Sequence, residues 1–344
     1  MMSTSRRLDT KPRSQVHASP LLSGRVRAID PEEDNKVFEL LYDYETTQLK
    51  RDEFSRDVTF AGTNRSAAYI ESVGGTAHNL GVLRGDKIAV CIPLIDPNSN
   101  WWGRSLSHDI IPICRSGQTI HLTCHQGHRH VAVIVDRDLC EENWGGDGLG
   151  PTLKINDVLK KTEQRFLRVD AQQLRIWGER LSKVVLQSAS QKSHLSAQAL
   201  ENELITAVRT LFEDGDSIAF NEPAAKSLVE SALMHADNSP GCSPTISDLC
   251  VRLNVSRRTL ELAFQKLMGK SPLRFLMQRR LSRAYEILKQ GSPDSLRVTD
   301  AAMACGFHEF GRFACKYRAA FDESPRQTLY RRTTTENRSS SILV

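Results

Sequence analysis

Two short segments in the last third of the chain carry side chains that can hydrogen-bond to flat polar groups. In the first segment, Arg257, Arg258 and Glu261 share one side at the start of a predicted helix. An Arg guanidinium donates two parallel hydrogen bonds to paired acceptors such as those of guanine, and a Glu carboxylate accepts from the amino group of cytosine. Ser256 comes just before them, and its hydroxyl can cap the helix by accepting a backbone N–H. This grouping predicts contacts with the base edges of a nucleic acid.

The second segment offers a comparable set after a tight turn, for which Gly306 supplies the expected positive φ. The side chains left for solvent or DNA are His308, Gly311, Arg312, Cys315 and Lys316. The expected core side of the same helix consists of Phe310, Phe313, Tyr317 and Phe321. Arg312 and Lys316 suit phosphate contacts as well as base contacts, and phosphate contacts fix position without specifying sequence. A merely solvated face is the alternative for both.

Each segment predicts a helix, a turn and a second helix, over Thr245 to Gly269 and Val298 to Phe321. Apolar residues recur at helix-face spacing, so each unit can bury one side and expose the other. Ser271 to Gly291 predicts a connecting helix, with Pro272 tolerated in its first turn. About eighteen residues give roughly 27 Å, and the flanking half-helices make up the difference to about 34 Å, one turn of DNA. The two units can therefore enter adjacent major-groove segments of double-stranded DNA.

Positive charge is concentrated in this region. The 344-residue chain has 46 Lys and Arg against 41 Asp and Glu, a formal net charge of +5. Residues 222–332 contain 18 basic and 11 acidic side chains, or +7, which leaves 28 against 30, or −2, for the remainder. A basic surface favours polyanions such as DNA, although a solvated basic surface is the plain alternative. The helix spacing is the stronger argument.

Composition sets the broad class. The length and the 40% hydrophobic content predict two domains with packed cores. The eight cysteines form no Cys-x-x-Cys pair, so we expect reduced thiols and a cytoplasmic protein. No apolar run reaches the roughly 18 residues of a membrane span, and no membrane partner is expected. Residues 1–29 are predicted to be a mobile arm and residues 333–344 a disordered tail.

Residues 30–165 predict a β-rich domain. Clusters of β-branched residues run from Lys87 to Ile95, from Asp109 to Cys124 and from His130 to Asp136, separated by Gly, Pro and Asn. Such short runs broken by turn residues are typical of antiparallel strands. The expected fold class is therefore α+β, with an N-terminal barrel or sandwich and an all-α domain over residues 222–332.

Residues 166–221 predict a helical linker between the two domains. The apolar stripe of its last helix consists of Leu200, Leu204, Val208 and Leu211. Ser196 near the start and Gly215 after the end mark the limits of that helix. Such a stripe more often packs against its own domain than against a second copy, so a homodimer is the lesser alternative.

Residues 222–332, about a third of the chain, resemble the DNA-binding domain of the AraC/XylS family of bacterial transcription regulators. The resemblance rests on SRRTLELAF with GKSP, on RRLSRAYEIL and on CGFHEFGRFACKYRAAFDESPRQTLYRR, in that order. It implies a sequence-specific regulator, an activator that works with RNA polymerase. It also implies base contacts from Arg257, Arg258, Glu261, Leu262, Gly311, Arg312 and Cys315.

Several positions depart from the family pattern. Leu262 stands where a basic residue is frequent, Gly311 where Ser is common, and Asp322 where Gly is usual. Within the family, DAAMACGF with Gly311 and Tyr317 is most similar to the ethanolamine-operon regulators. That similarity implies ethanolamine with adenosylcobalamin as inducers.

The family's N-terminal domains often bind a small effector, so the resemblance implies a small-molecule effector for the β-rich domain. Trp101 and Trp102, with Trp144 in a Gly-rich loop, are candidates to wall the pocket. Indole faces suit apolar groups and cations such as an ammonium group. Core packing is the plainer explanation for these residues.

The stretch HLTCHQGHRH has side chains that can bind metals. It holds His121, Cys124, His125, His128 and His130, and strand alternation would place His121 and His125 on one face. We expect no metal, because no carboxylate follows at the usual cupin spacing and a polar strand and turn is the plainer explanation.

Two other functions stay open. A metal-dependent barrel enzyme with a DNA-binding appendage needs a catalytic constellation, and the sequence shows no nucleophile motif, phosphate loop or spaced metal triad. An architectural DNA binder needs no effector. Strong sequence preference would separate a regulator from an architectural binder.

Overall fold

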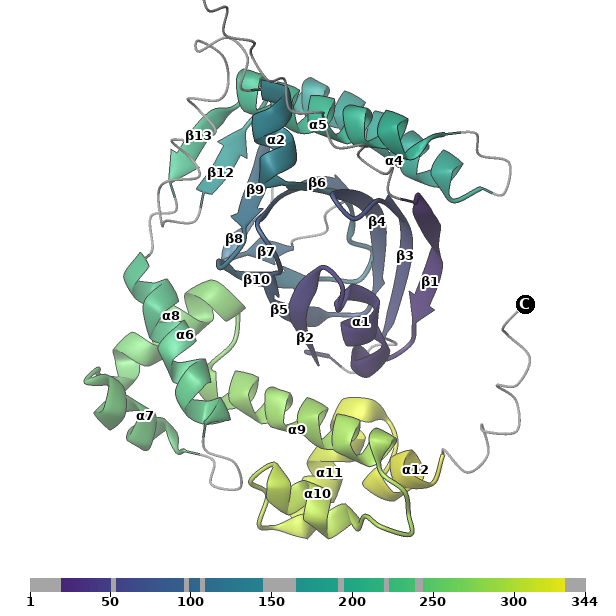
Figure 1. Ribbon diagram of the computed structural model, residues 1–344. Coiled ribbons are helices and arrows are strands. Elements are labelled where there is room, and N and C mark those ends of the chain that lie inside the picture. The colour runs from purple at the N-terminus through teal and green to yellow at the C-terminus, as the bar shows by residue number, and fades with distance from the viewer. Residues whose placement is uncertain are drawn as a thin grey trace, which may run out of the picture.

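The computed structural model describes residues 20–50, 54–95, 99–105, 109–144, 165–190, 195–219, 223–238 and 244–331. The N-terminal part consists of two antiparallel sheets that curve around a common interior and together form a barrel (Figure 1). The C-terminal part is helical (Figure 1). The predicted α+β fold class is confirmed.

The larger sheet has the strand order β1-β3-β4-β11-β6-β9-β12-β13 within the described residues. Its strands are β1 Leu22–Ala28, β3 Ser55–Gly62, β4 Ser66–Gly74, β6 Lys87–Ile95, β9 Ile110–Arg115, β11 Arg129–Asp136, β12 Arg165–Arg168 and β13 Asp216–Ala219. The smaller sheet has the order β2-β5-β10-β7-β8. Its strands are β2 Tyr42–Gln48, β5 Ala77–Leu83, β7 Asn100–Trp101, β8 Arg104–Ser105 and β10 Thr119–Cys124.

Strand β11 shows how the sequence produces this layer. Val131, Val133 and Val135 face outward, whereas Ala132 and Ile134 face the interior between the sheets. Both faces are covered, which explains why HVAVIVD is a continuous apolar run rather than an alternating one. The interior face packs against the smaller sheet, and the outer face packs against helices.

The residues predicted to be a helical linker belong to the β-rich domain. Helices α4 (Ala171–Ser188) and α5 (Ala197–Asp214) cover the outer face of the larger sheet (Figure 1), and β12 and β13 extend that sheet. Fully buried in this layer are Leu200, Leu204, Val208 and Leu211. The separate linker at residues 166–221 was therefore wrong, because its apolar stripe and its two flanking strands complete the sheet.

The N-terminal boundaries also need correction. Residues 22–28, assigned to a mobile arm, form β1 and pair with β3. Helix α1 (Pro31–Phe38) interrupts the region predicted to be strand, and the Asp30 side chain caps it by accepting the N–H groups of Glu32 and Glu33. A short helix of this kind has too few turns to show a periodicity. Residues 1–19 and 332–344, with the rest of the predicted arm and the tail, lie outside the described residues.

The C-terminal helices confirm the two helix-turn-helix units. The first unit is α7 (Ile246–Leu253) with α8 (Arg257–Met268), and the second is α10 (Val298–Ala304) with α11 (Phe310–Phe321). The joining helix α9 spans Pro272–Gln290. The other helices are α2 Arg137–Trp144, α6 Pro223–Asp237 and α12 Pro325–Tyr330. In the described part of the chain, no helix combines the length and the apolar composition needed to cross a bilayer.

Left-handed residues make the turns of both units. Asn254 has a φ of 51° after α7, and Gly306 has a φ of 74° after α10, as expected for Gly306. Asp322 has a φ of 60° after α11, where the family pattern has Gly. Asp and Asn tolerate this conformation better than other residues with a side chain, so the departure at Asp322 keeps the helix end.

The two units differ in how they are held. The second unit has its own core, in which Phe313 packs against Phe307 and Tyr317 with ring centroids 4.8 and 5.5 Å away. The core of the first unit is continuous with the barrel, because Phe264 and Phe275 belong to the same apolar cluster as the barrel interior. Phe310 was predicted to be in the core but is 40% exposed, so that assignment was wrong.

Phe313→Ala should lower the free energy of unfolding of the second unit by about 3 to 5 kcal/mol, because it leaves a cavity at the centre of a small core. Phe310→Ala, on the same helix but largely exposed, is the matched control and should cost much less. Denaturant unfolding followed by circular dichroism measures both. Equal losses in the two variants would contradict the burial assigned to Phe313.

Candidate nucleic-acid interface

Helix α8 presents its first two turns to solvent. Ser256 caps it by accepting the N–H of Thr259 at 3.0 Å, as its position predicts. Arg257 donates from Nε to the Glu261 carboxylate at 2.9 Å, one helical turn away. Arg258 is exposed and has no hydrogen bond or ion pair with the described residues, and Leu262 is 59% exposed. Arg258 therefore has a guanidinium that can bind a ligand without first breaking an internal pair.

Helix α11 presents a second exposed face. His308, Gly311, Arg312, Cys315 and Lys316 are all exposed. Arg312 pairs with Glu309 at 2.9 Å, and the Lys316 ammonium lies 3.8 Å from the Met277 sulfur of α9. A Cβ added at Gly311 would meet no atom within 4 Å, so the fold itself does not require Gly there. A bare backbone at this point permits close approach of another molecule.

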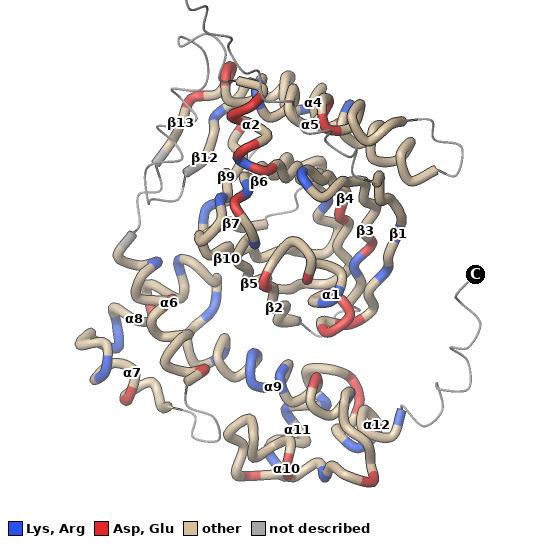
Figure 2. Tube along the Cα trace, viewed as in Figure 1, with Lys and Arg blue, Asp and Glu red and all other residues tan. Residues whose placement is uncertain are grey.

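Helix α9 positions both faces. It packs against α8 at one end and against α10, α11 and α12 at the other, so the two units are attached to one rigid element. Lys and Arg lie along α8, α9 and α11 (Figure 2). The candidate base-contacting residues are thus brought onto two exposed helices that share a support.

Comparisons with known proteins bear on this region. A family model described as a helix-turn-helix domain matches residues 249–331. The HTH-type transcriptional regulator GbdR of Pseudomonas aeruginosa is 38% identical over 106 residues, which cover 31% of this chain and 27% of GbdR. The XylDLEGF operon transcriptional activator 2 of Pseudomonas putida is 35% identical over 75 residues, covering 22% of this chain and 48% of the activator. The C-terminal region is an AraC-type DNA-binding domain.

A solved structure of a probable AraC family transcriptional regulator from Rhodopseudomonas palustris is 34% identical. It covers 30% of this chain and 96% of that chain, with a TM-score of 0.28. The match to GbdR spans about a quarter of that regulator. The relatives are named as regulators and activators, so the barrel enzyme with a DNA-binding appendage finds no support. The ethanolamine-operon subtype, with its inducers ethanolamine and adenosylcobalamin, stays a prediction.

The AraC-type domain packs against the barrel, and the contact between them forms a junction. Gly103, in the turn between β7 and β8 with a φ of 74°, lies against the C-terminal end of α8. A Cβ at this position would overlap the Lys266 carbonyl oxygen. The contact leaves the N-terminal end of α8, with its recognition side chains, exposed. The barrel thus holds the first unit from behind.

Aromatic rings fill the centre of this contact. Phe275 of α9 meets His78 edge to face at 5.0 Å, and His78 Nε2 is 3.2 Å from His121 Nδ1. Trp102 lies over His121, with ring centroids 3.9 Å apart, and the Lys226 ammonium of α6 lies 4.3 Å from the Trp102 ring centroid. Burial lowers the pKa of His78 to about 3, with Arg279 and Lys270 adding to the effect. This imidazole is therefore neutral at physiological pH.

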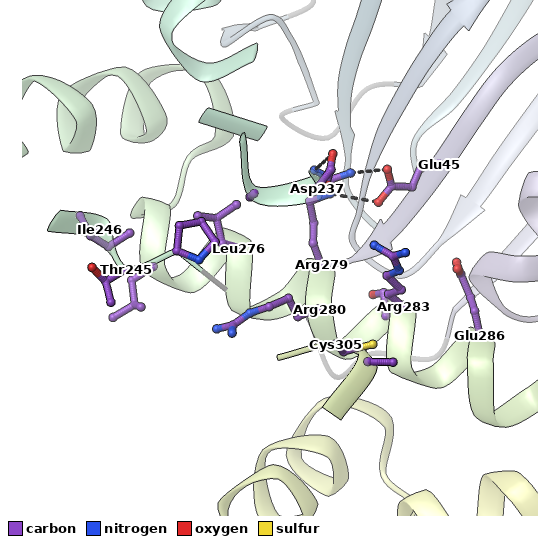
Figure 3. A pocket seen from close by; sticks show the side chains of 15 residues that line it. Glu45, Asp237, Thr245, Ile246, Leu276, Arg279, Arg280, Arg283, Glu286 and Cys305 are labelled. Carbon is purple, nitrogen blue, oxygen red and sulfur yellow. Dashed lines mark hydrogen bonds and ion pairs between the residues drawn. The ribbon is translucent and has the colours of Figure 1, made fainter. Parts of the chain in front are cut away.

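Ion pairs surround the aromatic centre. Arg279 of α9 pairs with Glu45 of β2 and with Asp237 of α6, the latter at 3.2 Å (Figure 3). Lys289, at the other end of α9, pairs with Asp30 and with Glu33 at 3.4 Å. Acidic residues on α1 and basic residues on α9 therefore face each other across the junction (Figure 2). Charge complementarity of this kind fixes orientation more than it adds affinity.

Glu286 of α9 faces α1 at the same junction. Asn35 donates a hydrogen bond to its carboxylate at 3.4 Å. Burial raises the pKa of Glu286 to about 7; Glu45, Glu32 and Asp30 add to the rise, and Arg283 opposes it. The junction thus contains a carboxyl group that titrates near neutral pH.

The three tryptophans proposed for an effector pocket do not come together. Trp101 and Trp102 are buried in the cluster that joins the barrel and the first unit, and Trp144 is buried in the cluster under α4 and α5. They therefore do not wall one pocket. A role for Trp101 or Trp102 in effector binding stays a prediction.

The histidine-rich stretch is divided between two pairs. His121 pairs with His78, and His128 Nε2 lies 3.0 Å from His130 Nδ1. His125 lies in the turn after β10 and not beside His121 on one strand face, so the predicted alternation was wrong there. Within the described residues, no three His, Cys, Asp or Glu side chains are grouped to hold a metal ion. The absence of a bound metal stays a prediction.

The junction residues escaped the sequence analysis. Arg279, Lys289 and Gly103 make its principal contacts, and nothing in their immediate sequence identifies their partners. One signal was available, since Arg279 falls on the side of α9 that also carries Phe275 and Leu276. A charged residue on an apolar stripe is seldom buried unless it is paired.

Arg258→Ala should weaken binding to the preferred DNA site by about 1 to 3 kcal/mol and relax preference at one base position, because a bidentate base contact is lost. Lys316→Ala should weaken binding to all sequences alike and reduce the salt dependence. Lys183→Ala, which removes one exposed charge from distant α4, is the control. Titrations at several salt concentrations measure these effects. Equal, sequence-independent losses for both would show that the base-contacting helix is misassigned.

The titration of Glu286 predicts a pH dependence of stability. Its pKa is about 7 in the folded chain against an ordinary 4.5, so the folded state holds a proton that the unfolded state releases between these values. The free energy of unfolding should fall as pH rises from 4.5 to 7, by on the order of 1 to 3 kcal/mol. Glu286→Gln should remove this loss, so its gain in Tm over the wild type should grow from pH 5 to pH 8. For the exposed control Glu39→Gln, the difference in Tm from the wild type should be the same at pH 5 and at pH 8. A gain in Tm for Glu286→Gln that does not change with pH would refute the raised pKa of Glu286.

Proposed function

We propose that this chain is a sequence-specific transcription regulator, an activator that binds two adjacent major-groove segments. The observation that carries the proposal is the pair of exposed recognition faces on α8 and α11, attached to one helix in an AraC-type domain. The relatives' names, regulators and activators, support the same function. RNA polymerase is the partner that an activator of this kind requires.

We infer that the barrel controls the geometry of the two units. The first unit shares its core with the barrel, whereas the second unit is held by its own core. A shift of the barrel against α8 therefore moves one recognition helix relative to the other. A small-molecule effector that favours one position would change DNA binding without touching DNA.

Dimerisation through α5 has weaker support. The apolar stripe of α5 that was proposed for dimerisation is buried against the larger sheet. A homodimer therefore needs another surface, and size measurement of the full chain at micromolar concentration tests it.

Selection of full-length protein on random duplex DNA tests the function. A regulator should enrich a motif with two boxes spaced by about one helical turn, roughly 10 base pairs. An architectural binder would enrich no motif. A single enriched box with free flanks would show that the second unit does not contact bases.

Gly103→Ala should reduce the preference for a two-box site over a single-box site at least about fivefold, because the added methyl group pushes the barrel hairpin from α8 and loosens the spacing of the units. Gly117→Ala is the matched control, since Gly117 has a similar φ of 77° and open space around its Cβ position. Affinity measured on both DNA sites distinguishes the effects. Equal losses on both sites would mean that the junction does not set the geometry.

A further inference from the structure

A cavity of about 460 Å³ lies beside the junction, between the two helix-turn-helix units and the barrel. Its walls come from the end of α6, the start of α7, the middle of α9, the end of α10 and Glu45 of β2 (Figure 3). The volume is within the range of small-molecule sites. By contrast, the barrel interior leaves a cavity of only about 30 Å³ beside Tyr69 and Trp101, room for little more than a water molecule. In this conformation, the junction cavity has room for a ligand and the barrel interior does not.

Some charged side chains of the cavity form ion pairs and others do not. The acidic residues of the cavity are Glu45, Asp237 and Glu286, and the first two are paired with Arg279. Arg283 is exposed and has no hydrogen bond or ion pair with the described residues. Arg283 is therefore one cationic group of the cavity that has no ion pair, although the Glu286 carboxyl group lies near it.

Arg280 is the second such group. Its Nε is buried and has no partner among the described residues. Its other nitrogens make long contacts, 3.5 Å to the Gly306 carbonyl and 3.8 Å to the Met277 sulfur, and its guanidinium lies 5.1 Å from the Phe307 ring centroid. A buried donor left unpaired is costly, and more so when it is charged, so an anion that accepts from it is favoured. The Ser282 hydroxyl, buried in the same wall, likewise has no described partner.

The remaining wall is apolar. It consists of Ala236, Pro244, Ile246, Leu273, Leu276 and Ala304. An inorganic ion would leave this surface uncovered, whereas an acid with a hydrocarbon body would cover it and gain free energy by removing apolar surface from water. A DNA phosphate would also pair with Arg280, but the sugar–phosphate backbone of a duplex has no hydrocarbon body to cover this wall.

We propose that the cavity binds a small organic acid, with its carboxylate on Arg280 and its hydrocarbon body along Leu273 and Leu276. The ligand would touch α7 of the first unit and α10 of the second, and would thereby fix their relative position. Only this consequence for DNA rests on the proposed function. Binding of the acid can be measured without DNA, so a failure of the binding site can be distinguished from a failure of the proposed regulator function.

Calorimetric titration of the full chain with sodium octanoate, 3-phenylpropanoate and octylamine tests the proposal. One or both acids should bind, and octylamine, which reverses the charge of octanoate, should not. Arg280→Met should weaken acid binding at least tenfold, and Arg274→Met, an exposed position on α9 outside the cavity, should leave it unchanged. Ala304→Phe, which fills the cavity without changing charge, should also weaken binding and keeps the test valid if Arg280→Met fails to fold.

The proposal is overturned if neither acid binds at 10 mM, or if binding survives in Ala304→Phe and Arg280→Met alike. Displacement of the acid by a duplex of arbitrary sequence would also overturn it, because Arg280 would then be a phosphate contact. A gain in two-box DNA affinity with bound acid would extend the inference to regulation. Acid binding with no such change would retain the site and refute its regulatory consequence.

Discussion

The structure depends on one continuous apolar cluster that joins the barrel interior to the first helix-turn-helix unit. Phe264, Leu267 and Phe275 are buried together with the inward-facing residues of both sheets. Separating the barrel from α8 and α9 would expose these side chains, each of which contributes about 1.5 to 3 kcal/mol when fully buried. The first unit is therefore held to the barrel by apolar packing, whereas the second unit has a separate core at the far end of α9.

A buried ionic network supports the other end of the same contact. Arg56 of β3 is completely buried and pairs with Asp34 of α1 and Glu71 of β4. Because an unpaired charge at such a site would be costly, the network holds α1 in one position on the barrel. Helix α1 in turn presents Asp30 and Glu33 to Lys289. Both ends of α9 are thus held against the barrel, the first by apolar packing and the second by ion pairs.

Basic side chains are buried and paired at the junction but exposed on α8 and α11. At the junction, basic side chains such as Arg279 are buried and paired. On the recognition faces, Arg258 and Lys316 are exposed, and Arg257 and Arg312 have only exposed partners on their own helices. Exposed pairs of this kind are worth at most about 1 kcal/mol, so exchanging them for DNA contacts costs little. The strong contacts of the chain therefore lie at the junction, whereas the proposed recognition faces carry only weak pairs.

Local sequence specified the two units, because helix periodicity, caps and left-handed turn residues act within a few positions of one another. Ser256 and Gly306 could be placed correctly for this reason, and the β-branched run of β11 identified a strand. The inclusion of β12 and β13 in the sheet, and the docking of α9 on the barrel, came only from folding. Those contacts join residues far apart in the chain, such as Glu45 with Arg279, and depend on shape and charge meeting in space, which neighbouring residues do not encode.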